Sequence, residues 1–187
     1  RGIIARDDEI LVTLGAQNGL YLIGDLMGGG EAVIGMENPG YPDARNIFQL
    51  TRNRVRGLPL DDEGMVVDRR LSGCTAVFVT PSHQFPTSIT MSGARREALL
   101  AAAGRDNFLI IEDDYEAEVN HLRRPTPALK SEDREGRVIY VGSLSKSLFP
   151  GLRLGYVVGH PSLIAELRAL RGAMLRHPPS MIQEAAA

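Results

Sequence analysis

Short apolar runs of strand length alternate along the chain with longer segments in which apolar residues recur at helical spacing. This alternation constrains the fold more than any other feature of the sequence. We expect strands over residues 10–14, 32–36, 54–58, 76–80, 108–111, 137–141 and 152–158. Helices are expected over residues 20–27, 44–50, 66–71 and 94–103, and a last helix places Leu163, Ile164, Leu167, Leu170 and Met174 on one apolar face. The pattern predicts an α/β fold, with a mostly parallel sheet covered by helices on both sides.

The ends of two elements carry further signals. Ser92 precedes the helix over residues 94–103 and is a good N-cap residue. In the last helix, Arg168, Arg171 and Arg176 are available to the side opposite the apolar face. We expect these three arginines to form a solvated face.

Composition excludes several classes of protein. The chain has 187 residues, enough for one domain with a buried core, and its 43% apolar and 24% charged residues are ordinary for a globular protein. A formal net charge of −2 gives no electrostatic footprint for nucleic acid or an anionic membrane. No apolar stretch approaches the roughly 18 residues that would cross a bilayer. We therefore expect neither DNA binding by this chain alone nor membrane insertion.

Cysteine and histidine usage adds two expectations. Cys74 is the only cysteine, lies beside an apolar run and cannot form an internal disulfide, which fits a buried residue in a cytoplasmic protein. The four histidines, which are His83, His121, His160 and His177, show no metal-ligand spacing with Cys74 or a carboxylate. We expect no metal site.

Polar residues follow the predicted strands, at the end of the sheet where parallel α/β folds bind their ligands. These post-strand loops are Gly15-Ala16-Gln17, Asn38-Pro39-Gly40-Tyr41, residues 81–86, Glu112-Asp113-Asp114-Tyr115 and Ser143-Leu144-Ser145-Lys146. We expect them to converge on one edge of the sheet. A lone lysine after a strand is usually solvated, so Lys146 is a candidate only because of the residues around it.

The order Asp113, Tyr115, Ser143, Ser145, Lys146 and Arg153 resembles the aminotransferase class I and II family. In detail, residues 80–87, 112–116 and 137–146 resemble the aminotransferase-like domain of MocR/GntR-type transcriptional regulators, and the resemblance extends from Gly2 to about Pro179. It implies that residues 1–187 form the large, pyridoxal 5′-phosphate-binding domain of a fold-type I transferase. The chain opens on Arg1 without an initiator methionine and stops within a helical pattern, so we expect a piece of a longer protein. An N-terminal DNA-binding region and a C-terminal small domain would then lie outside it.

The resemblance implies roles for four residues around the cofactor ring. Lys146 forms the Schiff base with the cofactor aldehyde, and Asp113 keeps the pyridine nitrogen protonated. Tyr115 hydrogen-bonds the phenolate oxygen of the cofactor. Tyr41, after a Pro-Gly turn, is the candidate for stacking on the ring, and a packed loop tyrosine is the alternative. Asp114 competes with Asp113, because adjacent strand residues face opposite ways and only one of the two can point at the ring. We prefer Asp113 because it shares a face with Tyr115.

The cofactor phosphate needs several donors. Gly15 permits a tight turn that places backbone N–H groups at a helix N-terminus, where the helix dipole also favours an anion. The expected phosphate cradle consists of Gly15, Ala16, Gln17, Ser143, Ser145 and Arg153.

The sequence departs from the wider family at one loop. Many members carry Asn-Pro-Thr-Gly where this chain reads Phe85-Pro86-Thr87-Ser88, so the asparagine that contacts the cofactor oxygen is missing. Gln84 or His83 would substitute for it, and Gln84 is our candidate.

Two functions share this predicted pocket. The first is the effector domain of a regulator that binds pyridoxal phosphate and an amine or amino acid, forms a homodimer in its full-length form, and contacts DNA only through a domain outside this chain. The second is a stand-alone aminotransferase that acts on an amino acid and a 2-oxo acid, with Lys146 moving the proton between substrate and cofactor. A helix-turn-helix pattern upstream of Arg1 would distinguish them.

Overall fold

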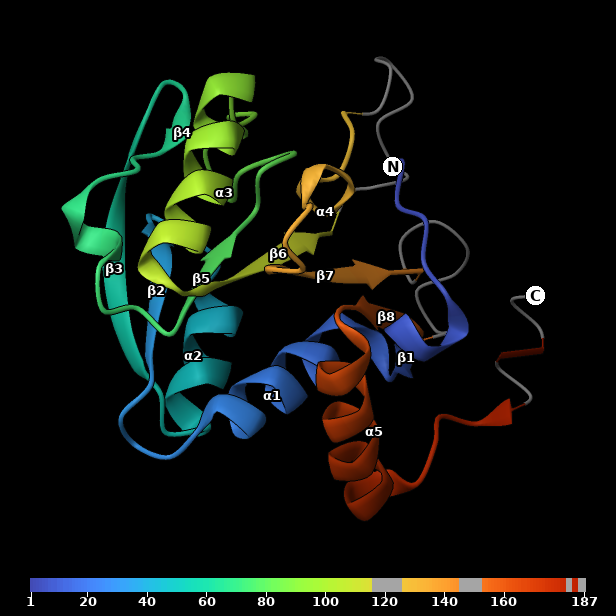
Figure 1. Ribbon diagram of the computed structural model, residues 1–187. Helices are drawn as coiled ribbons and strands as arrows, with labels where there is room; N and C mark the ends of the chain where they lie inside the picture. The colour runs from blue at the N-terminus through green and yellow to red at the C-terminus, as the bar shows by residue number, and fades with distance from the viewer. Residues whose placement is uncertain (116–125, 145–152, 181–182, 185–187) are drawn as a thin grey trace.

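The computed structural model describes residues 1–115, 126–144, 153–180 and 183–184. These residues form an eight-stranded sheet in the order β1-β8-β7-β6-β5-β2-β3-β4 (Figure 1). Its strands are β1 (Ile10–Thr13), β2 (Val33–Asn38), β3 (Arg54–Asp61), β4 (Gly64–Met65), β5 (Ala76–Val79), β6 (Leu109–Asp114), β7 (Val138–Ser143) and β8 (Gly155–Val158). The helices are α1 (Gly15–Met27), α2 (Pro42–Leu50), α3 (Gly93–Asp106), α4 (Leu129–Glu132) and α5 (Pro161–Leu175), with 3-10 turns η1 (Asp7–Glu9) and η2 (Arg69–Leu71).

The middle of the sheet is parallel, as the alternation of strands and helices predicts. Strands β3, β2, β5, β6 and β7 pair in parallel, whereas β4, β8 and β1 pair antiparallel at the two sides. All four residues of β5 are buried, which is typical of a strand that is covered on both faces. The carboxyl ends of β2, β5, β6 and β7 therefore meet at one edge.

Helices cover both faces of the sheet (Figure 1). On one face, α1, α2 and α5 contribute Leu20, Phe48 and Ile164 to a core that includes the sheet residues Phe78 and Ile111. On the other face, α3 and α4 contribute Leu99 and Leu129 to a core with Val77 and Val138. Both predicted features, the parallel sheet and the two helical layers, are confirmed.

Two local predictions, an N-cap at Ser92 and a helix over residues 66–71, have different outcomes. The N-cap prediction is confirmed, because the Ser92 side chain accepts a hydrogen bond from the backbone nitrogen of Arg95 at the start of α3. The helix predicted over residues 66–71 is wrong. Val66 donates its N–H to the Pro59 carbonyl of β3, and only the turn η2 follows. Pairing with the neighbouring strand replaces the helix there.

The solvated arginine face predicted on α5 is wrong for Arg171. Arg171 is only 9% exposed, and its guanidinium donates to the carbonyl of Val12 in β1, while burial lowers its pKa. Arg168 donates to the carbonyl of Ile10 in the same strand but stays exposed. Strand β1 lies at the edge of the sheet, where arginine side chains replace a neighbouring strand as hydrogen-bond donors.

A buried glutamate links β2 to the loop after β5. Glu37 is 2% exposed, and its Oε2 accepts hydrogen bonds from the backbone nitrogen and hydroxyl of Thr80 and from the Gln84 amide. Burial raises the pKa of Glu37 to about 7, and these hydrogen bonds oppose the rise only in part. The loop is thus held by a carboxyl group that titrates near neutrality.

This raised pKa predicts a specific pH dependence of stability. A carboxyl whose pKa rises from 4.5 to about 7 on folding contributes stability that is fully present below pH 4.5 and is lost as the pH rises through 7. Glu37→Gln cannot lose a proton, so it should become more stable relative to wild type across this window, by up to about 3 kcal/mol. Urea unfolding between pH 5 and pH 8 measures the difference.

The control is Glu97→Gln, which changes an exposed glutamate on α3 and should leave the profile unchanged. Glu112, whose pKa burial also raises to about 7, is present in every variant and cancels in the comparison. A wild-type curve parallel to that of Glu37→Gln would contradict the assignment.

Candidate functional site

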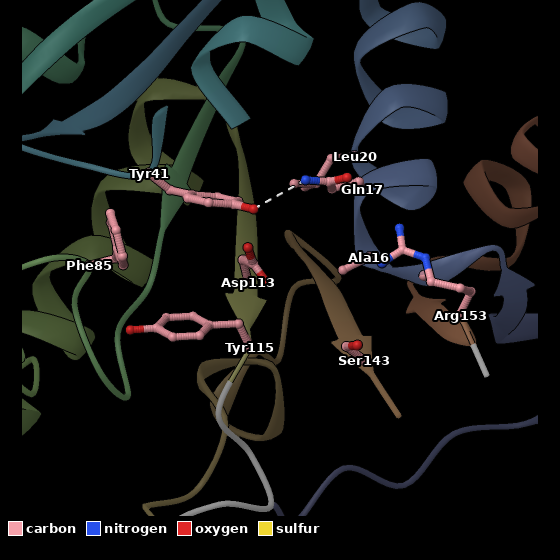
Figure 2. Close-up of a pocket in the computed structure, with 10 residues that line it drawn as sticks. Ala16, Gln17, Leu20, Tyr41, Phe85, Asp113, Tyr115, Ser143 and Arg153 are labelled. Atoms are coloured by element: carbon pink, nitrogen blue, oxygen red, sulfur yellow. Dashed lines mark hydrogen bonds between the residues drawn. The ribbon is translucent and has the colours of Figure 1, made fainter. Parts of the chain in front are cut away.

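A pocket of about 380 Å³ opens at the carboxyl edge of the sheet, within the range typical of small-molecule sites. The side chains around it come from the start of α1, the ends of β6 and β7, and three loops (Figure 2). Its lining consists of Gly15, Ala16, Gln17, Leu20, Tyr41, Phe85, Asp113, Tyr115, Ser143 and Arg153. The polar loops that follow the strands do converge, as expected from a parallel sheet.

One end of the pocket is built to receive an anion. Gly15 begins α1 with a positive φ of 76°, and a Cβ placed on it would lie 3.6 Å from Nη2 of Arg153. The N-terminus of a 13-residue helix and a guanidinium group therefore meet at one point.

The approach of α1 to the sheet depends on Gly155 in β8. A Cβ on Gly155 would lie 2.5 Å from the carbonyl carbon of Gly15 and 2.7 Å from the nitrogen of Ala16, closer than real side chains come. With no side chain there, the first turn of α1 rests directly on β8. The missing Cβ thus sets the position of the backbone N–H groups at this end of the pocket.

The other end of the pocket is acidic. Asp113 and Tyr115 both line it, whereas the neighbouring Asp114 accepts hydrogen bonds from Arg1 Nε at 2.6 Å and Tyr140 Oη at 2.9 Å outside the pocket. Asp113 and Asp114 are only 4% and 3% exposed. The strand alternation that favoured Asp113 over Asp114 is therefore observed.

Three aromatic rings form the wall beside Asp113 (Figure 2). Phe85 makes edge-to-face contacts with Tyr41, at a centroid distance of 5.6 Å, and with Tyr115, at 6.4 Å. The Tyr41 hydroxyl bonds to Asp43 Oδ2 at 3.2 Å and accepts from the Gln17 amide, which fixes its ring, and burial raises its pKa. These contacts make the wall preorganised.

The structure does not bring Gln84 to the pocket. Its side chain is 2% exposed, its amide nitrogen donates to Glu37, Pro39 and Phe85, and its amide oxygen accepts from Thr87. The pocket lining instead includes Phe85, the residue that stands where the wider family carries asparagine. Phe85 and Leu20 were missed by sequence reasoning. The signal for Phe85 is its position in Phe85-Pro86-Thr87-Ser88, where the wider family carries asparagine.

The remaining predicted residues have three different outcomes. Ser143 lines the pocket with Gly15, Ala16, Gln17 and Arg153, so the structure brings together five of the six residues expected to hold a phosphate. Ser145 and Lys146 lie outside the described residues. His83, the alternative to Gln84, packs its ring against Tyr115 at a centroid distance of 6.2 Å.

The charges of the pocket suit a dipolar ligand. Among the lining residues that the structure describes, Asp113 provides the carboxylate and Arg153 the guanidinium, from opposite ends. The described residues contain no cluster of three or more His, Cys, Asp or Glu side chains placed for a metal ion. Nor does any described helix combine the length and apolar character needed to span a membrane. The site is thus suited to a ligand with a negative group at one end and a basic group at the other.

The known proteins that resemble the chain include two relatives by sequence and one solved structure. The HTH-type transcriptional regulator TauR of Rhodobacter capsulatus is 50% identical over 98% of the chain, which spans 38% of that protein. The aromatic-amino-acid aminotransferase 1 of Thermococcus litoralis is 35% identical over 85% of the chain, which spans 40% of that protein. The α-aminoadipate aminotransferase LysN of Thermus thermophilus, solved as a complex with N-(5′-phosphopyridoxyl)-L-leucine, superposes with a TM-score of 0.88 at 30% identity over 95% of the chain and 48% of its own.

The chain therefore spans less than half the length of each of these relatives. The family model for aminotransferase class I and II matches residues 3–187, nearly the whole sequence. With the parallel sheet, the pocket at its carboxyl edge and these similarities in agreement, the chain belongs to the aminotransferase class I and II family.

Proposed function

We propose that this chain is the pyridoxal 5′-phosphate-binding, aminotransferase-like effector domain of a MocR/GntR-type transcriptional regulator. The observation that carries the proposal is the 50% identity to TauR over 98% of the chain. The full-length protein would contact DNA through a region upstream of Arg1, act as a homodimer in the cytoplasm, and bind an amine or amino acid. A C-terminal small domain would complete the site.

The described residues fit pyridoxal 5′-phosphate. Its phosphate matches the N-terminus of α1, which begins at Gly15, and the Arg153 guanidinium beside it. Asp113 would hold the proton on the pyridine nitrogen, and the Ser143 hydroxyl would add a donor to the phosphate end. Tyr115 and Tyr41 would bind the ring from the aromatic side.

When bound, the cofactor supplies an electron sink for reactions at an amine carbon. The residues of this chain would position the cofactor and hold a proton on its ring nitrogen. The buried Asp113 would lie beside the ring nitrogen, and Arg153 with the α1 N–H groups would anchor the opposite end. The aromatic wall of Tyr41, Phe85 and Tyr115 would shield one side of the cofactor from water. Lys146, outside the described residues, is our candidate for covalent attachment.

The second candidate is a stand-alone aminotransferase, favoured by the 35% identity to the Thermococcus litoralis enzyme. It would use the same pocket, so the pocket residues do not separate the two functions. They differ in what precedes Arg1, and DNA binding separates them.

The full-length protein should bind its own promoter DNA, and a version that begins at Arg1 should not, because residues 1–187 carry a net charge of −2. A gel-shift titration with and without pyridoxal phosphate measures this. Amino-acid turnover with 2-oxoglutarate, measured on the same full-length preparation, is the counter-test. Efficient turnover without DNA binding would establish the enzyme and reject the regulator.

Covalent attachment of the cofactor is expected at Lys146. Borohydride reduction of the cofactor-loaded full-length protein, followed by peptide mass analysis, should locate the added mass on that residue. Lys130 provides the matched control, since it is the other lysine of the chain and pairs with Asp133 at 3.1 Å on α4. Lys146→Ala should abolish the adduct and Lys130→Ala should retain it, and the reverse result would overturn the assignment.

Asp113 and Asp114 should differ in their effect on the bound cofactor. Asp113→Asn removes the carboxylate inside the pocket and should change the absorbance spectrum of the loaded protein and its response to pH. Asp114→Asn makes the same chemical change one residue away, outside the pocket, and should leave the spectrum as in wild type. A spectral change in Asp114→Asn alone would mean that the two roles are exchanged.

A further inference from the structure

Strand β6 ends in three consecutive buried carboxylates. The first and the third accept hydrogen bonds from residues that do not line the pocket. Glu112, Asp113 and Asp114 are 0%, 4% and 3% exposed. Glu112 accepts hydrogen bonds from the backbone nitrogens of Leu129 and Lys130, both at 2.8 Å. Asp114 accepts from Arg1 and Tyr140, so the two flanking acids have partners on the side away from Asp113.

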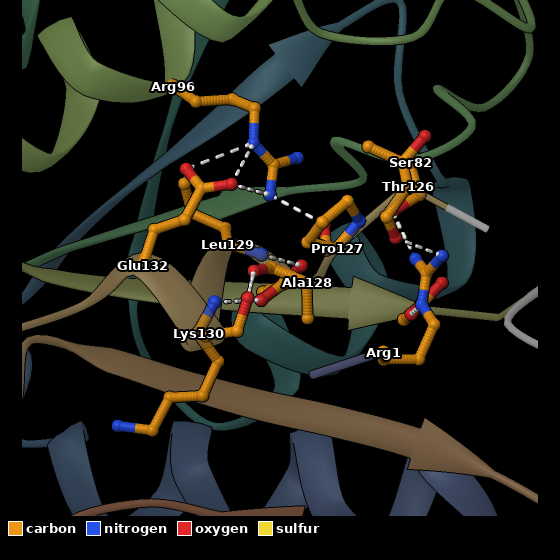
Figure 3. A network of polar contacts seen from close by, with 12 residues as sticks. Arg1, Ser82, Arg96, Thr126, Pro127, Ala128, Leu129, Lys130 and Glu132 are labelled. Atoms are coloured by element: carbon orange, nitrogen blue, oxygen red, sulfur yellow. Dashed lines mark hydrogen bonds and ion pairs between the residues drawn. The ribbon is translucent and has the colours of Figure 1, made fainter. Parts of the chain in front are cut away.

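Arg1, the first residue of the chain, contacts three parts of this region (Figure 3). Its Nε pairs with Asp114 Oδ2 at 2.6 Å, its Nη1 donates to the Thr126 carbonyl at 2.5 Å, and its Nη2 donates to the hydroxyl of Ser82. The side chain is only 15% exposed. Each branch of the guanidinium therefore has a different partner, in β6, in the segment before α4 and in the loop after β5.

The backbone near Arg1 is held as well. The Arg1 carbonyl accepts a hydrogen bond of 2.9 Å from the backbone nitrogen of Ala128, the residue before α4. Ile3 and Ala5 pack against a small core that contains Ala128 and Tyr140. Side-chain and backbone contacts thus fix the same five-residue segment, residues 1–5, which we call the N-terminal segment.

The partners of Arg1 are neighbours of the pocket wall. Asp114 lies between Asp113 and Tyr115, which both line the pocket. Ser82 precedes His83, whose ring contacts Tyr115, and the same loop carries Phe85. A shift of either element at the pocket would move an acceptor of Arg1. A buried ion pair stabilises a structure only when its geometry is good. Such a shift would therefore weaken the docking of the N-terminal segment.

We propose that Arg1 is a positioning residue that couples occupation of the pocket to docking of the N-terminal segment. The inference rests on the proposed function, because it takes pyridoxal phosphate as the ligand and the N-terminal segment as the link to an upstream DNA-binding region. Ligand contacts hold the end of β6 and the loop after β5 in the arrangement that suits the three acceptors of Arg1. The docked Arg1 holds the same arrangement for the ligand.

The coupling is reciprocal. If cofactor binding favours docking by a given factor, docking strengthens cofactor binding by the same factor, and typical couplings are about 5-fold to 150-fold. Loss of the Arg1 contacts should therefore weaken cofactor binding, although Arg1 itself is not among the pocket-lining residues.

The first arm of the test uses the wild-type full-length protein. Hydrogen exchange is measured with and without saturating pyridoxal phosphate, in peptides that cover residues 2–5 and Ala128. The Ala128 amide is informative because it donates to the Arg1 carbonyl and lies outside the pocket lining. We expect the cofactor to slow exchange in both peptides by about 5-fold or more.

The second arm compares Arg1→Gln with Arg6→Gln in the full-length protein. Arg6 is the matched control, since it lies just beyond the N-terminal segment and its side chain, 69% exposed, pairs with the surface residue Asp8. Arg1→Gln should raise the dissociation constant for pyridoxal phosphate by about 5-fold or more and remove the effect of cofactor on exchange at Ala128. Arg6→Gln should match wild type in both measurements.

The outcomes are distinguishable. If wild type binds the cofactor but exchange at Ala128 and residues 2–5 is unchanged by it, the coupling is refuted and the proposed function stands. An equal weakening by Arg6→Gln would also refute it, because the effect would not depend on the Arg1 contacts. If wild type binds no pyridoxal phosphate, the proposed function fails and the inference falls with it.

Discussion

The parallel pairing of β6 with β5 on one side and β7 on the other is the constraint on which the rest of the structure depends. Val79 lies opposite Glu112, and Asp113 lies opposite Val141, so the strand ends meet in a common edge. Because side chains alternate along a strand, this register sends Asp113 to one side and its two acidic neighbours to the other. If the register of β6 shifted by one residue, Asp113 would point away from the pocket and an acidic neighbour would point into it.

Buried carboxylates are costly unless they are hydrogen-bonded, and this fold places several at one edge. Glu112 is held by two backbone N–H groups of α4, and Asp114 by Arg1 and Tyr140. Desolvation still dominates at Glu112, whose pKa is raised to about 7. Burial also raises the pKa of Tyr140, and the neighbouring Asp114 adds to the rise, so Tyr140 remains a hydrogen-bond donor to that carboxylate. These partners keep the end of β6 ordered where the pocket needs it.

The end of the pocket at the N-terminus of α1 depends on the close approach of the α1 backbone to β8, and not on buried charges. Gly155 lets the first turn of α1 rest on β8, and Gly15 adopts a positive φ that favours glycine. Arg153 then lies beside the helix N-terminus. A pocket with an acid at one end, and a guanidinium beside a helix N-terminus at the other, follows from these two backbone features and from the register of β6.

Short-range patterns in the sequence determined the alternation of elements, the cap at Ser92 and the choice of Asp113 over Asp114, because each depends on neighbours within a few residues. Only the tertiary structure decided the places of Arg171, Gln84, Phe85 and Arg1. Arg171 is buried because β1 lies at the edge of the sheet, and Gln84 is withdrawn from the pocket because Glu37, 47 residues away, takes its amide. Arg1 meets Asp114 across 113 residues of sequence. Such pairings arise from packing of distant segments, which no local pattern of residue types encodes.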